Sequence, residues 1–364
     1  MKVLYTTTVP APYKMDMFEE LGKLCDLTVV FEKRKLSYRE EGWLRNDFQN
    51  FDAVFLKGVN IKDKMISTEI INIIRSEKFD AIIIGVYSTP SAMLAIEYMK
   101  MKNIQYILSS DGGLIKNDSY LSKTIKTRYI GAASAWLSTG VVTSEYLYHY
   151  GADRNNTFVY PFSSVKEADV LKTGISKAEK REKRFQIGVL EEHCVVSVGQ
   201  FIQRKGFDLL LTACKDIPRN IGFYIIGGTP TEEYIAMKKE YELSNVHFIG
   251  FKTKEELADY YMAADLFVLP TREDIWGLVV NEAMAYGLPV VTTDKCVAGL
   301  EMVEEGVTGS IIHINDVGSL RKQILYWLEK DNIDSQAVLS IAQKYTIESM
   351  AKRHAEILNM IKVD

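Results

Sequence analysis

The sequence has few of the residues that cross-link small proteins or bind metals in them. Only 4 of its 364 residues are cysteines, and none forms a CxxC pair, which speaks against a disulfide framework or a zinc site. No apolar run approaches the roughly 18 residues of a membrane span. The N-terminal segment MKVLYTTTVPAPYK does not have the long apolar core of a signal peptide. We therefore expect a cytoplasmic protein with free thiols.

Several nucleotide-binding motifs are missing as well. No GxGxxG follows the first predicted strand and no GxxxxGK[ST] occurs, which argues against a nicotinamide-dependent or P-loop enzyme. The formal net charge of -4 argues against nucleic acid as a partner, because phosphate backbones are bound by surplus Lys and Arg. The composition is that of a globular protein, and the chain is long enough for two domains.

Short β-rich runs alternate with longer helical segments, which predicts parallel sheets covered by helices. The charged stretch KTGISKAEKREKR (172–184) interrupts this alternation and is expected to connect two domains. We predict an N-terminal domain over 1–170, a C-terminal domain over 171–345, and a final helix over 346–364 that returns to the N-terminal domain. Strands are expected at 3–7, 27–31, 53–56, 81–85, 105–109, 135–138 and 158–161, and then at 194–198, 222–227, 246–250, 266–270, 290–293 and 310–313.

Parallel sheets bind ligands at the carboxyl ends of their strands, so the loops that follow the strands are the candidate sites. The loop after 194–198 reads SVGQFIQRKGFDLLLTA, with Arg204 and Lys205 just before a helix. Cations and free backbone N–H groups at a helix start suit a phosphate. A solvated basic turn explains this segment equally well.

The stretch EDIWGLVVNEAMAYGLPVVTT (273–293) repeats this arrangement of strand, polar loop and helix. Asp274 is expected at the helix entrance, and Glu282 lies a little over two helical turns further on in an apolar run. The absence of a side chain at Gly277 lets its backbone approach a ligand closely. The alternatives are a helix cap for Asp274 and an ion pair with a neighbouring cation for Glu282.

Together, the Arg-Lys-Gly run, the Asp274-x7-Glu282 spacing and the Gly299-x-Glu301 loop resemble retaining GT-B glycosyltransferases of the GT4 type, the glycosyl transferases group 1 family. The resemblance spans residues 195–318. It implies an α/β protein with the GT-B fold, in which two Rossmann-like doubly wound domains face each other across a cleft. It also implies a nucleotide-sugar donor in the C-terminal domain. The chain has no DxD motif, so we expect neither a metal nor another cofactor.

The resemblance assigns roles to residues of the C-terminal domain. Lys205 and Arg204 would neutralise the donor diphosphate, Glu282 would accept hydrogen bonds from the ribose, and Asp274 would hold hydroxyls of the transferred sugar. The family usually has Glu at the position of Asp274 and often Arg at that of Gln200. The remaining donor-side residues would be Gly199, Gly250, Phe251, Gly277 and Leu278, with Gly250 and Phe251 bordering the base.

The acceptor side is expected in the N-terminal domain. Asp111, in the SSDGG loop (109–113), is the candidate catalytic group there, although an Asp before two glycines is at least as often a turn residue. All five histidines lie beyond residue 148, so the early loops offer no imidazole base. The other acceptor-side candidates are Pro10, Tyr13, Lys14, Gly112 and Gly113.

The resemblance also implies a saccharide or lipid-linked acceptor, as in surface polysaccharide or glycolipid synthesis. Two sets of basic residues could then hold the protein at the inner face of a membrane, although a solvated surface explains each set as well. A GT-B nucleotide-sugar epimerase and a catalytically silent sugar-nucleotide-binding subunit are the alternatives to a transferase. The basic sets are Lys33, Arg34 and Lys35, and Lys116, Lys123, Lys126 and Arg128.

Overall fold

A computed structural model of the protein describes residues 1–34, 48–61, 64–330 and 333–361. The chain forms two compact units, one comprising Met1–Ser164 with Thr346–Asp364 and the other Val165–Tyr345. We call them the N-terminal and C-terminal units. The first break lies six residues before the domain boundary drawn from the sequence after residue 170.

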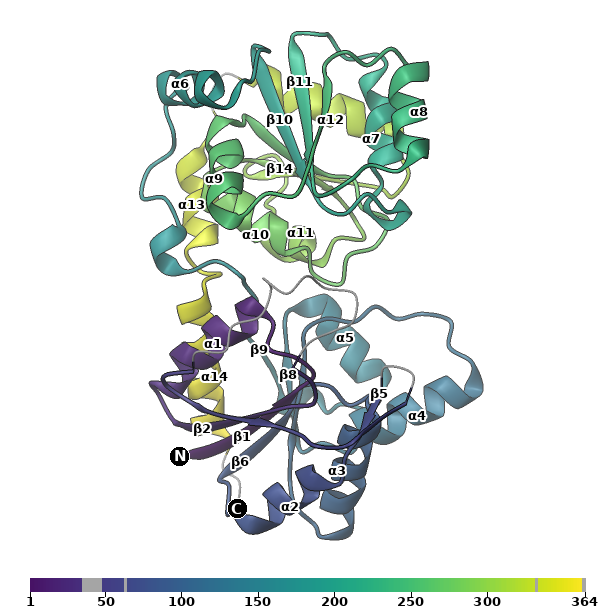
Figure 1. Ribbon diagram of the computed structural model, residues 1–364, viewed down its shortest axis with the longest axis vertical. Helices are drawn as coiled ribbons and strands as arrows, with labels where there is room; N and C mark the ends of the chain where they lie inside the picture. The colour runs from purple at the N-terminus through teal and green to yellow at the C-terminus, as the bar shows by residue number, and fades with distance from the viewer. Residues whose placement is uncertain (35–47, 62–63, 331–332, 362–364) are drawn as a thin grey trace. The chain divides into compact units, whose positions relative to one another are not determined.

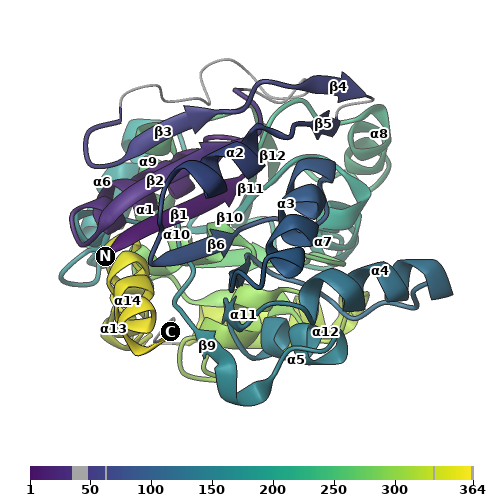
Figure 2. The same ribbon diagram turned by 90° about the horizontal axis from the view of Figure 1, so that it is seen from below.

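A seven-stranded parallel sheet in the order β3-β2-β1-β6-β7-β8-β9 forms the centre of the N-terminal unit (Figures 1 and 2). β-Branched and aromatic residues fill its central strands, as is usual where both faces of a parallel sheet are covered. All seven strands were predicted. They are β1 (Lys2–Thr7), β2 (Asp26–Phe31), β3 (Asp52–Phe55), β6 (Ala81–Ile84), β7 (Ile107–Ser110), β8 (Ala135–Ser138) and β9 (Thr157–Val159).

Helices cover both faces of this sheet. On one face, apolar side chains of α2 (Glu69–Ser76), α3 (Pro90–Met101) and α5 (Val141–His149) pack in one core with the sheet. On the other, α1 (Pro12–Gly22) packs against α14 (Ile347–Met360), as Figure 1 shows. The final helix therefore lies in the N-terminal unit. An antiparallel hairpin of β4 (Val59–Ile61) and β5 (Lys64–Ile66) was not predicted from the sequence.

The C-terminal unit contains a six-stranded parallel sheet in the order β12-β11-β10-β13-β14-β15. One layer of helices consists of α7 (Phe207–Cys214), α8 (Glu232–Glu240) and α12 (Val317–Glu329), whose apolar side chains share a core with the sheet. The other elements of this unit are α9 (Lys254–Ala263), α10 (Leu278–Ala285), α11 (Val297–Met302) and α13 (Ser335–Ala342). The strands, all predicted, are β10 (His193–Val198), β11 (Ile221–Ile226), β12 (Val246–Ile249), β13 (Leu266–Leu269), β14 (Val290–Thr293) and β15 (Gly309–Ile312).

The charged stretch 172–184 does not only connect domains, as the sequence suggested, because most of it belongs to helix α6 (Lys177–Ile187) of the C-terminal unit. Ser176 and Glu179 form a capping box at its start. The buried guanidinium of Arg184 donates to the carbonyl of Ala263 at 2.8 Å and contacts Asp265 at 2.6 Å. Polar contacts of an arginine thus attach α6, so apolar periodicity could not reveal the helix.

Candidate functional site

Lys205 lies in the turn after β10, where the sequence placed a phosphate site. The short 3-10 helix Gln203–Lys205 ends at Gly206, and α7 begins immediately after it. The methylene stem of Lys205 crosses over Gly199, where an added methyl group would lie 3.2 Å from Cε of the lysine. A side chain at residue 199 would therefore press against this lysine. The lysine side chain is only 11% exposed.

Lys205 forms an ion pair with Asp274, which comes from the loop after β13. Nζ of Lys205 lies 2.6 Å from Oδ2 of Asp274, although 69 residues separate the two. Oδ1 of the same carboxylate lies 3.6 Å from the guanidinium of Arg204, which also donates to the carbonyl of Glu273 at 2.6 Å. The structure therefore brings together the three residues that the family resemblance assigns to the donor diphosphate and the transferred sugar.

The alternative of a helix cap for Asp274 is wrong. Helix α10 begins at Leu278, its N-cap residue is Gly277, and no side chain caps it. Asp274 is instead fixed through its backbone, whose N–H donates to the carbonyl of Lys295 at 2.8 Å and whose carbonyl accepts from the N–H of Val297 at 3.2 Å. Its carboxylate is therefore available for the cations of the other loop.

Gly277 adopts a positive φ of 103°, and an added methyl group would meet Sγ of Cys296 at 2.8 Å. Only glycine suits this position. The first turn of a helix has backbone N–H groups without intrahelical partners, which favours a bound anion. Burial raises the pKa of Cys296 to about 11, so this thiol stays protonated beside the turn.

Glu282 is half-buried, although the residues around it in the sequence are mostly apolar. Its Oε2 accepts a hydrogen bond from the hydroxyl of Tyr261 at 3.2 Å. Burial, and after it the charge of Glu282, raise the pKa of Tyr261 well above its ordinary value, so the phenol remains a donor. The fully buried polar residue of α10 is Asn281, which accepts from the indole N–H of Trp276 at 2.7 Å.

Arg272 joins the two loops of this site and was not noticed in the sequence. Its guanidinium donates to both carboxylate oxygens of Asp208 in α7, at 2.8 and 2.5 Å, and to the carbonyl of Gln203 at 2.8 Å. Such bidentate ion pairs fix the relative orientation of the two side chains as well as pairing their charges. Arg272 and Asp208 are 64 positions apart in the sequence, so no local pattern could have indicated the pair.

The remaining donor-side candidates lie at the surface of the same unit. Gln200 follows Gly199 and is exposed. Gly250 and Phe251 come directly after β12, and the phenyl side chain is 68% exposed. Leu278 is the first residue of α10 and is half-buried.

In the N-terminal unit, three of the acceptor-side candidates meet. Nζ of Lys14, in α1, lies 2.6 Å from Oδ2 of Asp111, and the hydroxyl of Tyr13 donates to the same oxygen at 3.3 Å. The lysine side chain is 7% exposed and the carboxylate 25%. Asp111 is therefore held from α1, 98 residues away from Tyr13, and does more than shape its own turn.

The other acceptor-side candidates support this loop. Gly112 has a positive φ of 143°, and an added methyl group at Gly113 would enter the ring of Tyr146. Pro10 is buried next to the start of α1. The two glycines thus let the loop that carries Asp111 turn and pack closely.

The chain does supply an imidazole to the N-terminal unit, from α14. His354 is fully buried, its ring centroid lies 4.3 Å from that of Tyr160, and its Nδ1 is 2.8 Å from the carbonyl oxygen of Met350. Burial lowers its pKa to about 4. The sequence could not indicate this placement, because His354 is far from the N-terminal loops along the chain. The ring is buried and neutral, so it does not act as an exposed base for those loops.

Part of the second basic set is already neutralised. Lys126 pairs with Asp118 at 2.9 Å, and Arg128 pairs with Glu97 at 2.7 Å. Lys116 and Lys123 are exposed on or near α4 (Tyr120–Ile130), which projects from the side of the N-terminal unit in both views (Figures 1 and 2). Lys35 lies outside the described residues. None of the described helices combines the length and apolarity needed to cross a membrane.

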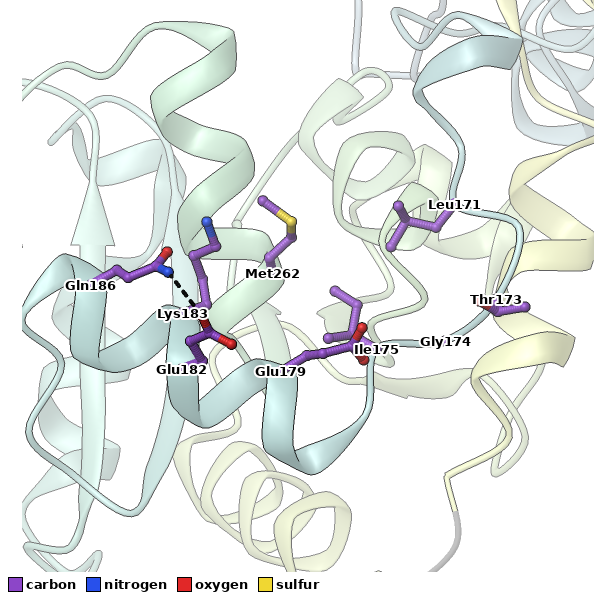
Figure 3. Close-up of a pocket in the computed structure, with 9 residues that line it drawn as sticks. All are labelled: Leu171, Thr173, Gly174, Ile175, Glu179, Glu182, Lys183, Gln186 and Met262. Carbon is purple, nitrogen blue, oxygen red and sulfur yellow. Dashed lines mark hydrogen bonds between the residues drawn. The ribbon is translucent and has the colours of Figure 1, made fainter.

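A pocket of about 400 Å³ lies elsewhere in the C-terminal unit, against α6 and α9 (Figure 3). Leu171, Ile175 and Met262 give it an apolar part, and Glu179 and Glu182 lie along its α6 side. None of the predicted site residues lines it. In the described part of the chain, no group of three or more His, Cys, Asp or Glu side chains could hold a metal ion.

Comparison with solved structures identifies the class of fold. The structure of the Anabaena protein HepE in complex with UDP has a TM-score of 0.77 to this chain at 16% identity, covering 99% of this chain and 100% of that one. The lipopolysaccharide outer core galactosyltransferase WaaB, in its apo form, has a TM-score of 0.72 at 13% identity over 99% of both chains. The two parallel-sheet, Rossmann-like units thus have the GT-B fold.

Residues 179–344 match the family model described as glycosyl transferases group 1. Over this region the chain is similar to the glycosyl transferases group 1 family. An uncharacterized glycosyltransferase of Methanocaldococcus jannaschii is 28% identical over 269 residues, 72% of this chain and 69% of that protein. The D-inositol 3-phosphate glycosyltransferase of Corynebacterium aurimucosum is 30% identical over 190 residues. That match covers 49% of this chain and 44% of the relative, so the chain spans about half the length of several curated relatives.

Proposed function

We propose that this protein transfers a sugar from a nucleoside-diphosphate sugar to a saccharide or lipid-linked saccharide acceptor, in the synthesis of a surface polysaccharide or glycolipid. The observation that carries the proposal is the arrangement of two loops in the C-terminal unit, the loops after β10 and β13. There, Lys205 and Arg204 lie beside Asp274, in the region that matches the family. Two cations with the uncapped first turn of α10 suit a diphosphate. UDP in the complex of the similarly folded HepE supports a nucleotide donor.

In the proposed reaction, the acceptor hydroxyl attacks the anomeric carbon from the side of the leaving group, so the configuration is retained. The new bond joins the acceptor oxygen to that carbon, the bond from the carbon to the diphosphate oxygen breaks, and the hydroxyl proton passes to the diphosphate. Lys205 and Arg204 stabilise the charge on the leaving group without a metal. Glu282 accepts hydrogen bonds from the ribose.

Asp111 serves the acceptor in this proposal. Lys14 and Tyr13 both contact its Oδ2, so the carboxylate is held in place while a quarter of its side chain remains accessible. It can accept a hydrogen bond from an acceptor hydroxyl. Contact with a membrane through the exposed Lys116 and Lys123 would suit a lipid-linked acceptor.

The test is a thermal-shift screen with UDP-, GDP- and ADP-sugars, followed by a transfer assay in excess EDTA. A donor at 100 times its Kd stabilises the folded protein by roughly 2.7 kcal/mol. We expect one base to shift the melting temperature and acceptor-dependent release of that nucleoside diphosphate to continue in EDTA. An epimerised sugar from donor alone would indicate an epimerase, binding without transfer a silent subunit, and activity only with Mg²⁺ a metal-dependent enzyme.

A further inference from the structure

Both oxygens of the Asp274 carboxylate face cations. Oδ2 lies 2.6 Å from Nζ of Lys205, and Oδ1 lies 3.6 Å from the guanidinium of Arg204. The side chains of Asp274 and Lys205 are 10% and 11% exposed, so water screens their attraction little. In this geometry the charge that a diphosphate would bring to Lys205 is already supplied by the protein.

The pair is held from both sides by the backbone. Contacts with Lys295 and Val297 fix the main chain of Asp274, and the stem of Lys205 lies across Gly199. The shorter side chain of Asp at this position still reaches the lysine. A direct hold on sugar hydroxyls would require the carboxylate to share or give up these cations.

We propose that Asp274 is the internal counter-ion of Lys205. It neutralises the lysine when no donor is bound, and it competes for the lysine with the diphosphate of donor and product. This inference rests on the proposed function, because it takes the diphosphate to bind at Lys205. Its consequence is faster product release, since the returning carboxylate replaces the charge of the departing diphosphate.

This role is tested by whether Asp274→Asn strengthens or weakens the binding of a diphosphate. We compare the Kd values of inorganic pyrophosphate and UDP for the wild type, Asp274→Asn and Asp274→Glu by calorimetry. Asp274→Asn removes the competing charge and is expected to bind both probes about 3- to 10-fold more tightly, since charges at such distances interact strongly in a partly buried site. Asp274→Glu restores the charge and is expected to return the Kd values towards those of the wild type.

The matched control is Asp259→Asn. Asp259 pairs with Lys183 at 2.9 Å, between α9 and α6, so this variant removes the same charge from a Lys–Asp pair of the same unit. It is expected to change both Kd values less than 2-fold. A similar tightening in this variant would mean that net charge alone is responsible, and it would overturn the inference.

The remaining outcomes separate the inference from the proposed function. Unchanged or weaker binding by Asp274→Asn, with wild-type binding intact, overturns the counter-ion role and leaves the donor site standing. Weaker binding together with a lowered melting temperature indicates a purely structural pair, which also overturns it. If the wild type binds neither pyrophosphate nor any of UDP, GDP and ADP, the proposed function fails and the inference falls with it.

Discussion

His354 is expected to make the N-terminal unit lose stability as the pH falls from 6.5 to 4. The ring is fully buried, and its Nδ1 lies 2.8 Å from the carbonyl oxygen of Met350. A carbonyl oxygen only accepts hydrogen bonds, so Nδ1 carries the proton of the neutral ring. Nε2 has no hydrogen-bond partner among the described residues. Burial therefore disfavours the imidazolium, and it lowers the pKa from 6.5 to about 4 against the opposing bond to Met350.

The magnitude follows from this shift in pKa. Between pH 6.5 and 4 the unfolded chain binds a proton at this residue and the folded chain does not, so acid favours unfolding in that window. Each pKa unit corresponds to about 1.4 kcal/mol, and a shift of about 2.5 units gives a loss of about 3 kcal/mol. Below pH 4 both states are protonated, and this residue causes no further loss. Above pH 6.5 its contribution to stability is complete.

The assay is hydrogen exchange at several pH values, read separately for peptides of the two units. His354→Leu and His354→Gln carry no titrating group at this position, and both are expected to remove about 3 kcal/mol of acid sensitivity from the N-terminal unit. The C-terminal unit serves as the internal reference. If the wild type and both variants lose stability equally between pH 6.5 and 4, the assignment of a buried neutral imidazole is refuted.

Three further perturbations follow from the structure. Glu282→Gln replaces a charged hydrogen-bond acceptor by a neutral one. It should weaken the binding of the nucleoside diphosphate, measured by calorimetry, by about 1.5 to 3 kcal/mol, or roughly 10- to 100-fold. Equal affinity in the variant and the wild type would contradict the ribose contact. Ile357 is fully buried on α14, so Ile357→Ala should destabilise the N-terminal unit by about 2 to 5 kcal/mol. Met360 is 59% exposed, so Met360→Ala should leave the unfolding free energy of that unit almost unchanged. Similar effects of the two substitutions would contradict the packing of α14. Burial opposes the ionisation of Asp265, but His193, Lys180 and Arg184 outweigh burial and lower the pKa of this carboxyl to about 2. Its contribution to the stability of the C-terminal unit is therefore present above pH 3.8 and is lost as the pH falls through 2. Asp265→Asn should therefore remove acid sensitivity in that window. It should also destabilise the C-terminal unit by about 3 kcal/mol at pH 7, because the buried Arg184 loses its anionic partner, and a fully stable variant would exclude this role.

The sheets of both units could be predicted because parallel strands appear as short β-branched runs. All thirteen strands expected from the sequence are present, each within a residue or two of its expected position. Helix α6 and the β4–β5 hairpin were missed for different reasons. The helix has one buried side chain, that of Arg184, so its sequence shows no apolar stripe. The hairpin strands have three residues each, too few for a period to appear.

The types of residue at the site could be predicted, but their pairing could not. Lys205 and Asp274 were both chosen, yet nothing in a linear sequence indicates that their charged atoms lie 2.6 Å apart. The same holds for Lys14 and Asp111 in the other unit. The apolar run around Glu282 could not show that this side chain is only half-buried, because such a run on a short helix does not tell which of two adjacent polar residues faces the core. Here that residue is Asn281.

The most direct measurement of the central claim is the rate of acceptor-dependent transfer in Lys205→Ala beside Lys183→Ala. Lys183 also pairs with an aspartate in the C-terminal unit, but on α6, away from the loops that carry Lys205 and Asp274. If Lys205 stabilises the leaving diphosphate, its removal should lower kcat by roughly 10²- to 10³-fold, the usual cost of losing one group that stabilises developing charge. Lys183→Ala should retain the wild-type rate. Equal turnover in the two variants would contradict a donor diphosphate site at Lys205.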